Sequence, residues 1–193
     1  KLCHTILQKQ TIPQLKCATP KLNSVINTAT GVKITWNKVN GADSYTVYRK
    51  VGKGNWIAIK GNITSTSFTD TGAVSGTTYQ YTVKARNEAG FSAYNTKGLT
   101  IKYLNDPVLK TITSTKAGVN LKWNKVNGAE GYVIYRKTSN GKFAKIATVS
   151  GVSKLTYTDK KAKKGVTYTY KIKAFSGNTF SAQSNIKSIK DKY

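Results

Sequence analysis

The chain has 193 residues, of which 32 are lysine or arginine and 7 are aspartate or glutamate, giving a formal net charge of +25. No apolar run is long enough to cross a bilayer, which disfavours an integral membrane protein. One histidine and two cysteines offer little for metal or nucleophilic chemistry, which disfavours an enzyme.

Both halves of the chain carry the positive charge, with 14 basic and 3 acidic residues up to Asn105 and 18 and 4 beyond it. The arginines are Arg49, Arg86 and Arg136, and the other basic residues are lysines. Lysine is a hydrated point charge, whereas arginine presents a fork suited to bidentate recognition of bases. The composition therefore favours diffuse attraction to polyanions over base-specific binding of nucleic acid. The alternative is that the excess of lysines only keeps the module soluble.

Residues 1–19 match nothing in the second half of the chain and contain Cys3, Cys17 and His4. The two cysteines could form a disulfide, remain thiols or, together with His4, contribute to a metal site. Cys3 could also pair with a residue upstream if the chain begins inside a preceding module. Because the sequence starts without methionine or a signal peptide, we expect a mature product or a fragment of a longer protein.

One stretch of the chain occurs twice: residues 31–42 return as 118–129, with Trp36 matched by Trp123, 87 residues later. Apolar and polar residues alternate before each tryptophan, which is typical of a strand with one buried face. A repeat of this length predicts two copies of one domain. Equal placement in both copies favours a core position for each indole over a ligand-binding one.

The repeat defines the domain boundaries that we expect. The first domain covers 20–104 and the second covers 107–193, after an N-terminal extension or module remnant at 1–19. Only Asn105 and Asp106 lie between the domains. So short a join predicts a stiff end-to-end pair.

Short alternating segments separated by turn residues predict an all-β chain with seven strands in each copy. We expect Ile57 and Ile59 to point inward, as do Ala144 and Ile146 in the second copy. Ile186 and Ile189 are expected to be inward residues of the last strand. The strands predicted in the first copy are 21–27, 32–36, 44–50, 55–60, 66–69, 77–87 and 94–103.

Four motifs resemble the fibronectin type III family: Tyr45-Thr46-Val47-Tyr48-Arg49, Tyr132-Val133-Ile134-Tyr135-Arg136, Gly76-Thr77-Thr78-Tyr79-Gln80-Tyr81 and Gly165-Val166-Thr167-Tyr168-Thr169-Tyr170. The resemblance is greatest to tandem modules of secreted and wall-associated proteins of Gram-positive bacteria. It implies two tandem seven-stranded immunoglobulin-like β-sandwiches. It also implies that Tyr79 and Tyr168 are tyrosine corners, whose hydroxyls bond to nearby backbone.

The outer face of one sheet is the candidate ligand surface. If Ile57 points inward, Trp56 points outward beside aromatic and basic residues of neighbouring strands. Such a surface could stack sugar rings or bases while holding anionic groups. Cross-strand packing under lysine stems is the alternative. The candidate residues are Tyr48, Trp56, Lys84 and Arg86 in the first copy, and Tyr135, Phe143, Lys171 and Lys173 in the second.

The acidic residues predict no catalytic, metal or cofactor site. Asp43 and Glu130 occupy the same turn in the two copies, as do Asp70 and Asp159, so we expect all four to form turns or caps. No pair of acids stands out as converging in a cleft, as a glycoside hydrolase would need.

The sequence therefore predicts a non-catalytic, monomeric spacer or presentation segment of a bacterial protein that is secreted or attached to the cell wall. It could also act in adhesion, with an anionic glycan, teichoic acid or host surface glycoprotein as partner. The alternative is a polyanion- or carbohydrate-binding accessory module of a secreted enzyme. Either role makes it part of a larger parent protein, and nucleic acid is the less favoured partner.

Overall fold

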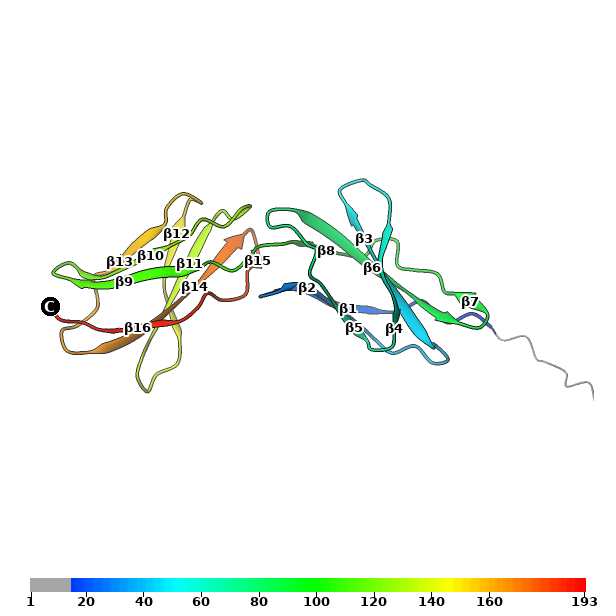
Figure 1. Ribbon diagram of the computed structural model, residues 1–193, viewed down its shortest axis with the longest axis horizontal. Helices are drawn as coiled ribbons and strands as arrows, with labels where there is room; N and C mark the ends of the chain where they lie inside the picture. Colours follow the sequence, from blue (N-terminus) through cyan, green and yellow to red (C-terminus); the bar gives the residue numbers. More distant parts are fainter. Residues whose placement is uncertain (1–14) are drawn as a thin grey trace, which may run out of the picture.

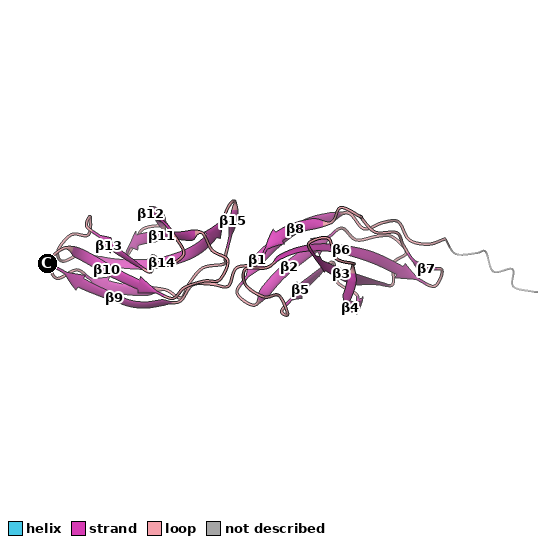
Figure 2. Cartoon of the chain, turned by 90° about the horizontal axis from the view of Figure 1, so that it is seen from above, coloured by secondary structure: helices cyan, strands magenta, loops and turns pink. Residues whose placement is uncertain are grey.

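The computed structural model describes residues 15–193, so Cys3 and His4 lie outside the described residues. This part of the chain consists of strands and turns arranged as two β-sandwiches in line (Figures 1 and 2). The predicted fold class, an all-β chain with two tandem sandwiches, is confirmed. Within residues 15–193 there is no helix with the length and apolarity needed to cross a membrane.

The first sandwich packs a three-stranded sheet, in the order β1-β2-β5, against a five-stranded sheet. The second sheet has the order β4-β3-β6-β7, and β8 also pairs with β6. All pairings are antiparallel. The strands are β1 (Leu22–Thr28), β2 (Gly31–Trp36), β3 (Ser44–Val51), β4 (Ile57–Ile63), β5 (Ser67–Asp70), β6 (Thr78–Asn87), β7 (Gly90–Phe91) and β8 (Leu99–Lys102).

The second sandwich repeats this arrangement with the sheet orders β9-β10-β13 and β12-β11-β14-β15, and β16 also pairs with β14. The duplicated sequence therefore gives a duplicated topology. Its strands are β9 (Leu109–Thr115), β10 (Gly118–Trp123), β11 (Gly131–Thr138), β12 (Ala144–Ser150), β13 (Thr156–Asp159), β14 (Thr167–Ser176), β15 (Thr179–Phe180) and β16 (Lys187–Lys190).

Each sandwich closes over one buried tryptophan. Only 2% of the surface of Trp36 and 3% of that of Trp123 is exposed. Trp36 lies edge-on to Tyr45 with ring centroids 5.4 Å apart, and Trp123 lies edge-on to Tyr132 at 5.3 Å. Edge-to-face pairs of this kind add to the stabilisation that burial gives.

The inward pattern predicted for the fourth strand of each sandwich is wrong in part. Ile57 is 66% exposed, and its counterpart Ala144 is exposed as well. The ladders β3–β4 and β11–β12 both shift register in mid-strand. A bulge of this kind adds a residue and breaks the two-residue alternation. Ile59 and Ile146 still pack against the cores, while Ile57 begins an edge strand at the rim of the sandwich.

The last strand also differs from the prediction at one position. Ile189 packs against the second core, but Ile186 is 50% exposed. Because β16 begins at Lys187, Ile186 falls in the preceding loop and not in the ladder. The inward position predicted for Ile186 is therefore wrong.

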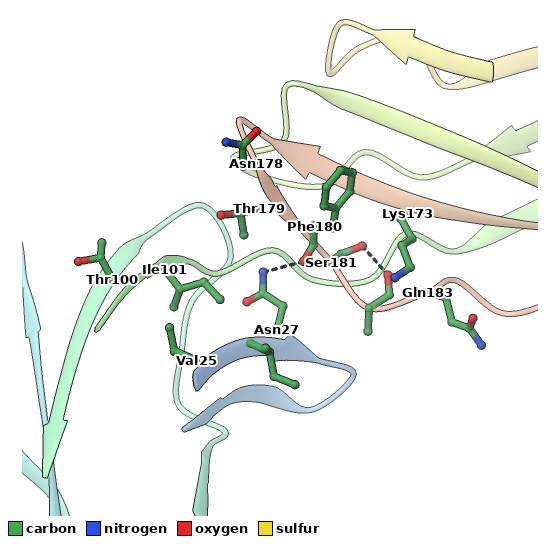
Figure 3. A pocket seen from close by; sticks show the side chains of 12 residues that line it. Val25, Asn27, Thr100, Ile101, Lys173, Asn178, Thr179, Phe180, Ser181 and Gln183 are labelled. Atoms are coloured by element: carbon green, nitrogen blue, oxygen red, sulfur yellow. Dashed lines mark hydrogen bonds between the residues drawn. The ribbon is translucent and has the colours of Figure 1, made fainter. Parts of the chain in front are cut away.

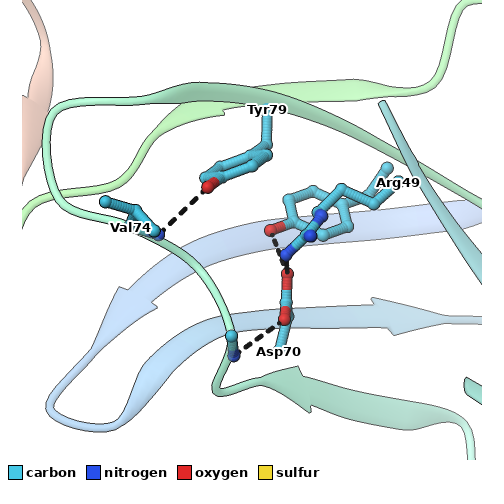
Figure 4. Close-up of polar contacts among 6 residues, drawn as sticks. Arg49, Asp70, Val74 and Tyr79 are labelled. Carbon is cyan, nitrogen blue, oxygen red and sulfur yellow. Dashed lines mark hydrogen bonds and ion pairs between the residues drawn. The ribbon is translucent and has the colours of Figure 1, made fainter. Parts of the chain in front are cut away.

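An ion pair between a buried aspartate and a partly buried arginine links the two sheets of each sandwich. In the first, Asp70 on β5 accepts hydrogen bonds from Arg49 Nη1 at 2.8 Å and from Tyr81 Oη at 2.8 Å (Figure 4). In the second, Asp159 accepts from Arg136 Nη1 at 2.7 Å and from Tyr170 Oη at 2.9 Å. Burial, reinforced by the bond to the aspartate, raises the pKa of Tyr81 and of its counterpart, so both phenols remain donors at neutral pH.

The same aspartates hold the turns that follow them. Gly72 N donates to Asp70 Oδ1 at 3.0 Å, and Lys161 N donates to Asp159 Oδ1 at 3.1 Å. These bonds are of the turn-forming kind that the sequence predicts. Each carboxylate thus serves a local turn with one oxygen and a long-range ion pair with the other.

The two tyrosines assigned to corners also bond to backbone next to this network. Tyr79 Oη accepts from Val74 N at 3.0 Å (Figure 4), and in the second sandwich Tyr168 Oη accepts from Lys163 N at 3.2 Å. The guanidinium carbon of the ion-paired arginine lies 4.9 Å from the ring centroid of Tyr79 and 4.7 Å from that of Tyr168. Corner, arginine and aspartate therefore form one connected unit in each sandwich.

Candidate functional site

Three aromatic rings meet on the outer face of the five-stranded sheet in the first sandwich. Tyr48 on β3 stacks on Tyr94 with centroids 6.1 Å apart, and Trp56 meets Tyr94 edge-on at 6.0 Å. Lys84 Nζ lies 5.5 Å from the Tyr48 centroid and 4.8 Å from the Tyr94 centroid. Lys50 Nζ lies 4.7 Å from the Trp56 ring. We call these five residues the aromatic platform.

Arg86 is a predicted member of this surface that the structure places elsewhere. It lies further along β6, opposite Ser44, and its guanidinium covers Phe91 at 5.3 Å. Arg86 is therefore not part of the cluster around Tyr94, and its role in a ligand surface stays a prediction.

The second sandwich has a related but different surface. Lys171 Nζ lies 4.3 Å from the Phe143 ring and 5.8 Å from the Tyr135 ring, and Lys137 Nζ lies 5.5 Å from Phe143. Lys171 also donates to Gln183 Oε1 at 2.8 Å. Burial and, to a smaller degree, the charge of Lys173 lower the pKa of Lys171. Here the cation covers the rings and is itself hydrogen-bonded.

Lys173 lies apart from those rings and lines a groove of about 510 Å³ between the two sandwiches (Figure 3). Other parts of its lining come from β1, β8 and the segment that contains β15. Asn27 Nδ2 donates to the carbonyl of Phe180 at 3.1 Å across this groove. Burial raises the pKa of Asp106, against the opposing charge of Lys173. The groove thus belongs to the domain junction.

The junction has no free linker. Tyr103 is buried in the core of the first sandwich, and the next residue, Leu104, is fully buried in the core of the second. Hydrogen bonds also cross the boundary, so the two bodies are held by more than the chain. These are Ser75 Oγ to Asn127 O at 2.9 Å, Asn27 Nδ2 to Phe180 O at 3.1 Å and Lys102 Nζ to Ser176 Oγ at 3.2 Å.

Two glycines touch where the sandwiches meet. A Cβ atom on Gly128 would lie 2.2 Å from Gly76 Cα, and one on Gly76 would lie 3.3 Å from Gly128 N. Both have positive φ, +80° and +93°. Gly41 holds the matching turn position in the first sandwich with φ +72°, yet nothing lies within 4 Å of its Cβ position. At this turn position, close backbone contact therefore occurs only in the copy that faces the junction.

The sequence did not single out Tyr94 or the junction glycines for these places. Tyr94 lies in a loop without strand periodicity, and only the return of that loop over β3 brings it to Tyr48. A comparison of the two copies offered one signal, since the position of Tyr94 holds Gln183 in the second. The sequence around Gly76 and Gly128 is typical of ordinary turns, because a contact between two domains does not change the local sequence pattern.

The disulfide proposed for Cys3 and Cys17 cannot be placed, because Cys3 lies outside the described residues. Cys17 Sγ lies 3.3 Å from the carbonyl oxygen of Gly41. Among residues 15–193, no three histidine, cysteine, aspartate or glutamate side chains come together as a metal site would require.

Comparison with known proteins gives a consistent set of relatives. Residues 18–100 match the family model described as fibronectin type III domain. A poly(3-hydroxybutyrate) depolymerase of Ralstonia pickettii is 47% identical over 58 residues, which is 30% of this chain and 11% of that protein. Exoglucanase B of Cellulomonas fimi is 26% identical over 189 residues, covering 86% of this chain and 16% of the enzyme. The chain thus spans less than a fifth of either relative.

Among solved structures, an Fn3-like protein from Clostridium thermocellum is 34% identical. The match covers 46% of this chain and 95% of that one, with a TM-score of 0.39.

Proposed function

Residues 18–100 belong to the fibronectin type III family, and on that premise we propose that the chain is a non-catalytic pair of such modules that spaces other domains of a larger bacterial protein. Its place is outside the cell, secreted or attached to the cell wall, and it acts as a monomer. Two of its relatives are named as a depolymerase and an exoglucanase, and it matches only a small part of each. We therefore propose that the parent protein acts on a polymer.

One observation carries this proposal: consecutive residues, Tyr103 and Leu104, lie in different cores. A flexible linker lets two domains tumble independently, whereas a junction without slack transmits orientation from one to the other. The hydrogen bonds across the boundary and the contact between Gly76 and Gly128 support the same stiffness. A stiff pair sets a fixed distance between whatever precedes it and whatever follows it.

The change Gly128→Ala is expected to loosen this junction while both sandwiches stay folded. Its methyl group would overlap the backbone of Gly76, which has no flexible side chain to move aside. In ¹⁵N relaxation measurements, the unchanged protein should tumble as one elongated body with a single diffusion tensor. The variant should show two tensors and shorter correlation times.

Gly41→Ala is the matched control for this experiment. It places an alanine at a similar positive φ in the same turn of the first sandwich, where no neighbour lies within 4 Å. Both variants carry the same backbone strain, but only Gly128→Ala should alter the tumbling. Independent tumbling of the two domains in the unchanged protein would rule out the spacer role.

A second function, binding of polyanions, is favoured by the state of the lysines. The two ion pairs among residues 15–193 both use arginines, so no lysine there has a carboxylate partner within 4 Å. The charge of the lysine side chains is thus available to teichoic acid, acidic glycans or a host surface glycoprotein. Such attraction gains most of its free energy from the release of counterions.

Binding of poly(glycerol phosphate) to the protein is expected to weaken at least about tenfold between about 50 and about 200 mM salt. Calorimetric titration at several salt concentrations gives the slope of log K against log salt, with uncharged dextran as the control polymer. Affinity that does not change with salt would eliminate this second function and leave the spacer role untouched.

A further inference from the structure

The aromatic platform of the first sandwich has the composition of a sugar-binding surface. Tyr48, Trp56 and Tyr94 are each partly exposed, and the ring of Tyr94 contacts the other two. Partly exposed rings on a sheet offer flat apolar faces that can stack on a ligand ring. The ammonium group of Lys50 lies over the Trp56 ring at 4.7 Å, and that of Lys84 lies over the Tyr94 ring at 4.8 Å, so both cations lie on the platform itself.

The platform is held in place by the loop that carries Tyr94. Asn95 Oδ1 accepts hydrogen bonds from Lys97 N at 3.0 Å and Gly98 N at 3.2 Å. Gly98 has a φ of +62°, and a Cβ atom there would lie 2.8 Å from Cη2 of Trp56. The indole therefore rests directly on the loop backbone. A surface fixed in this way loses little conformational entropy when a ligand binds.

The second sandwich lacks this arrangement. At the positions of Tyr94 and Trp56 it has Gln183 and Phe143, which removes one ring and shrinks another. Lys171 lies over Phe143 and donates to Gln183, so the cation there already has its partners. The two sandwiches therefore share a fold but differ on this face. Only the first has three adjoining aromatic rings there, and the lysines beside them have no carboxylate partner within 4 Å.

We infer that the aromatic platform binds an acidic polysaccharide, with a sugar ring stacked on Trp56 and Tyr94 and a carboxylate of the polymer held by Lys84 or Lys50. Charge complementarity selects this occupant, because the cations at the platform are lysines and both described ion pairs lie elsewhere. A neutral glycan would leave the ammonium groups unused. The inference rests on the second proposed function and gives it a ligand class and a location.

Trp56 makes the platform directly observable. Of the three tryptophans, Trp36 and Trp123 are buried in the cores, so a change in fluorescence on binding reports Trp56. Short polygalacturonate should change the emission and bind, whereas an uncharged cello-oligosaccharide of equal length should do neither at the same concentration. Equal binding of the two sugars would overturn the inference.

Variants then locate the contact. Tyr94→Gln inserts the residue that the second sandwich carries, so the fold should tolerate it, and it should weaken polygalacturonate binding about fivefold or more through loss of stacking. Tyr135→Gln is the matched change on the other sandwich and should have little effect on binding.

The lysine contact is tested separately. Lys84→Gln should lower the affinity for polygalacturonate and reduce the slope of log K against log salt by about one, whereas Lys33→Gln on the opposite sheet should change neither.

Two further polymers separate the possible failures. If inorganic polyphosphate binds as tightly as polygalacturonate and Tyr94→Gln changes neither, diffuse attraction to lysines stands and the platform is overturned. If oligothymidylate binds more tightly and is sensitive to Tyr94→Gln, the platform binds nucleic acid and the polysaccharide assignment is wrong. If no polyanion binds at low salt, the second function fails together with this inference.

Discussion

Replacing Trp123 by alanine is expected to lower the free energy of unfolding of the second sandwich by about 3–5 kcal/mol. The indole lies in the middle of the core and packs edge-on against Tyr132. Its removal leaves a cavity between two hydrogen-bonded sheets, which cannot close over it without breaking their ladders. Trp36→Ala should have the same effect on the first sandwich, because the packing around it is equivalent.

Amide hydrogen exchange followed by mass spectrometry measures this loss in each sandwich separately. Because about 1.4 kcal/mol corresponds to a factor of ten, peptides from β11 and β14 of Trp123→Ala should lose protection about a hundredfold or more. Peptides from β3 and β6 serve as the internal control and should change little. A loss below about tenfold would contradict the central role given to this indole.

Trp123→Phe is the conservative partner of that variant. In the described chain no hydrogen-bond acceptor reaches the buried Nε1 atom of Trp123. Phenylalanine keeps much of the ring volume and removes this unpaired donor, whose burial itself costs free energy. We therefore expect the loss of protection to be far smaller than for alanine. Equal losses in the two variants would show that the size of the ring is not what matters.

The sheets and their cores could be predicted because local pattern determines them. Val32, Ile34 and Trp36 alternate with polar residues, and all three are buried on β2. The same alternation precedes Trp123, so the second copy supports the strand assignment made in the first. Where the chain departs from that regularity, prediction failed. Ile57 lies opposite Arg49 at the first position of the edge strand β4, and its exposure there depends on where the sandwich ends, which alternation does not describe.

The candidate site was only half predictable. Strand alternation placed Tyr48 and Lys84 on one outer face, and they do meet there. Tyr94 depends on the path of a loop, and the separation of Arg86 from Trp56 depends on distance along a strand, which alternation does not measure. The junction contacts depend on the relative position of two domains. Pattern within one domain carries no information about that position.

Asp159→Ala is expected to destabilise the second sandwich by about 3–5 kcal/mol, as much as the loss of its tryptophan. The carboxylate is 2% exposed and accepts from Arg136 and from Tyr170. Alanine would leave a guanidinium and a phenol without their acceptor inside the sandwich. Most of this loss of stability comes from leaving Arg136 and Tyr170 without a hydrogen-bond acceptor. The lost attraction between the charges contributes less, because the attraction in an ion pair is largely offset by the free energy needed to desolvate the two charges.

The double variant Asp159→Leu with Arg136→Leu separates these two contributions. If stranded partners are the cause, removing both charges together should restore a large part of the protection lost in Asp159→Ala. Asp43→Ala removes the same charge from an exposed position of this highly basic chain, so it corrects for general repulsion and should change stability by less than about 0.5 kcal/mol. A double variant as unstable as Asp159→Ala would instead show that the ion pair itself holds β13 to the facing sheet.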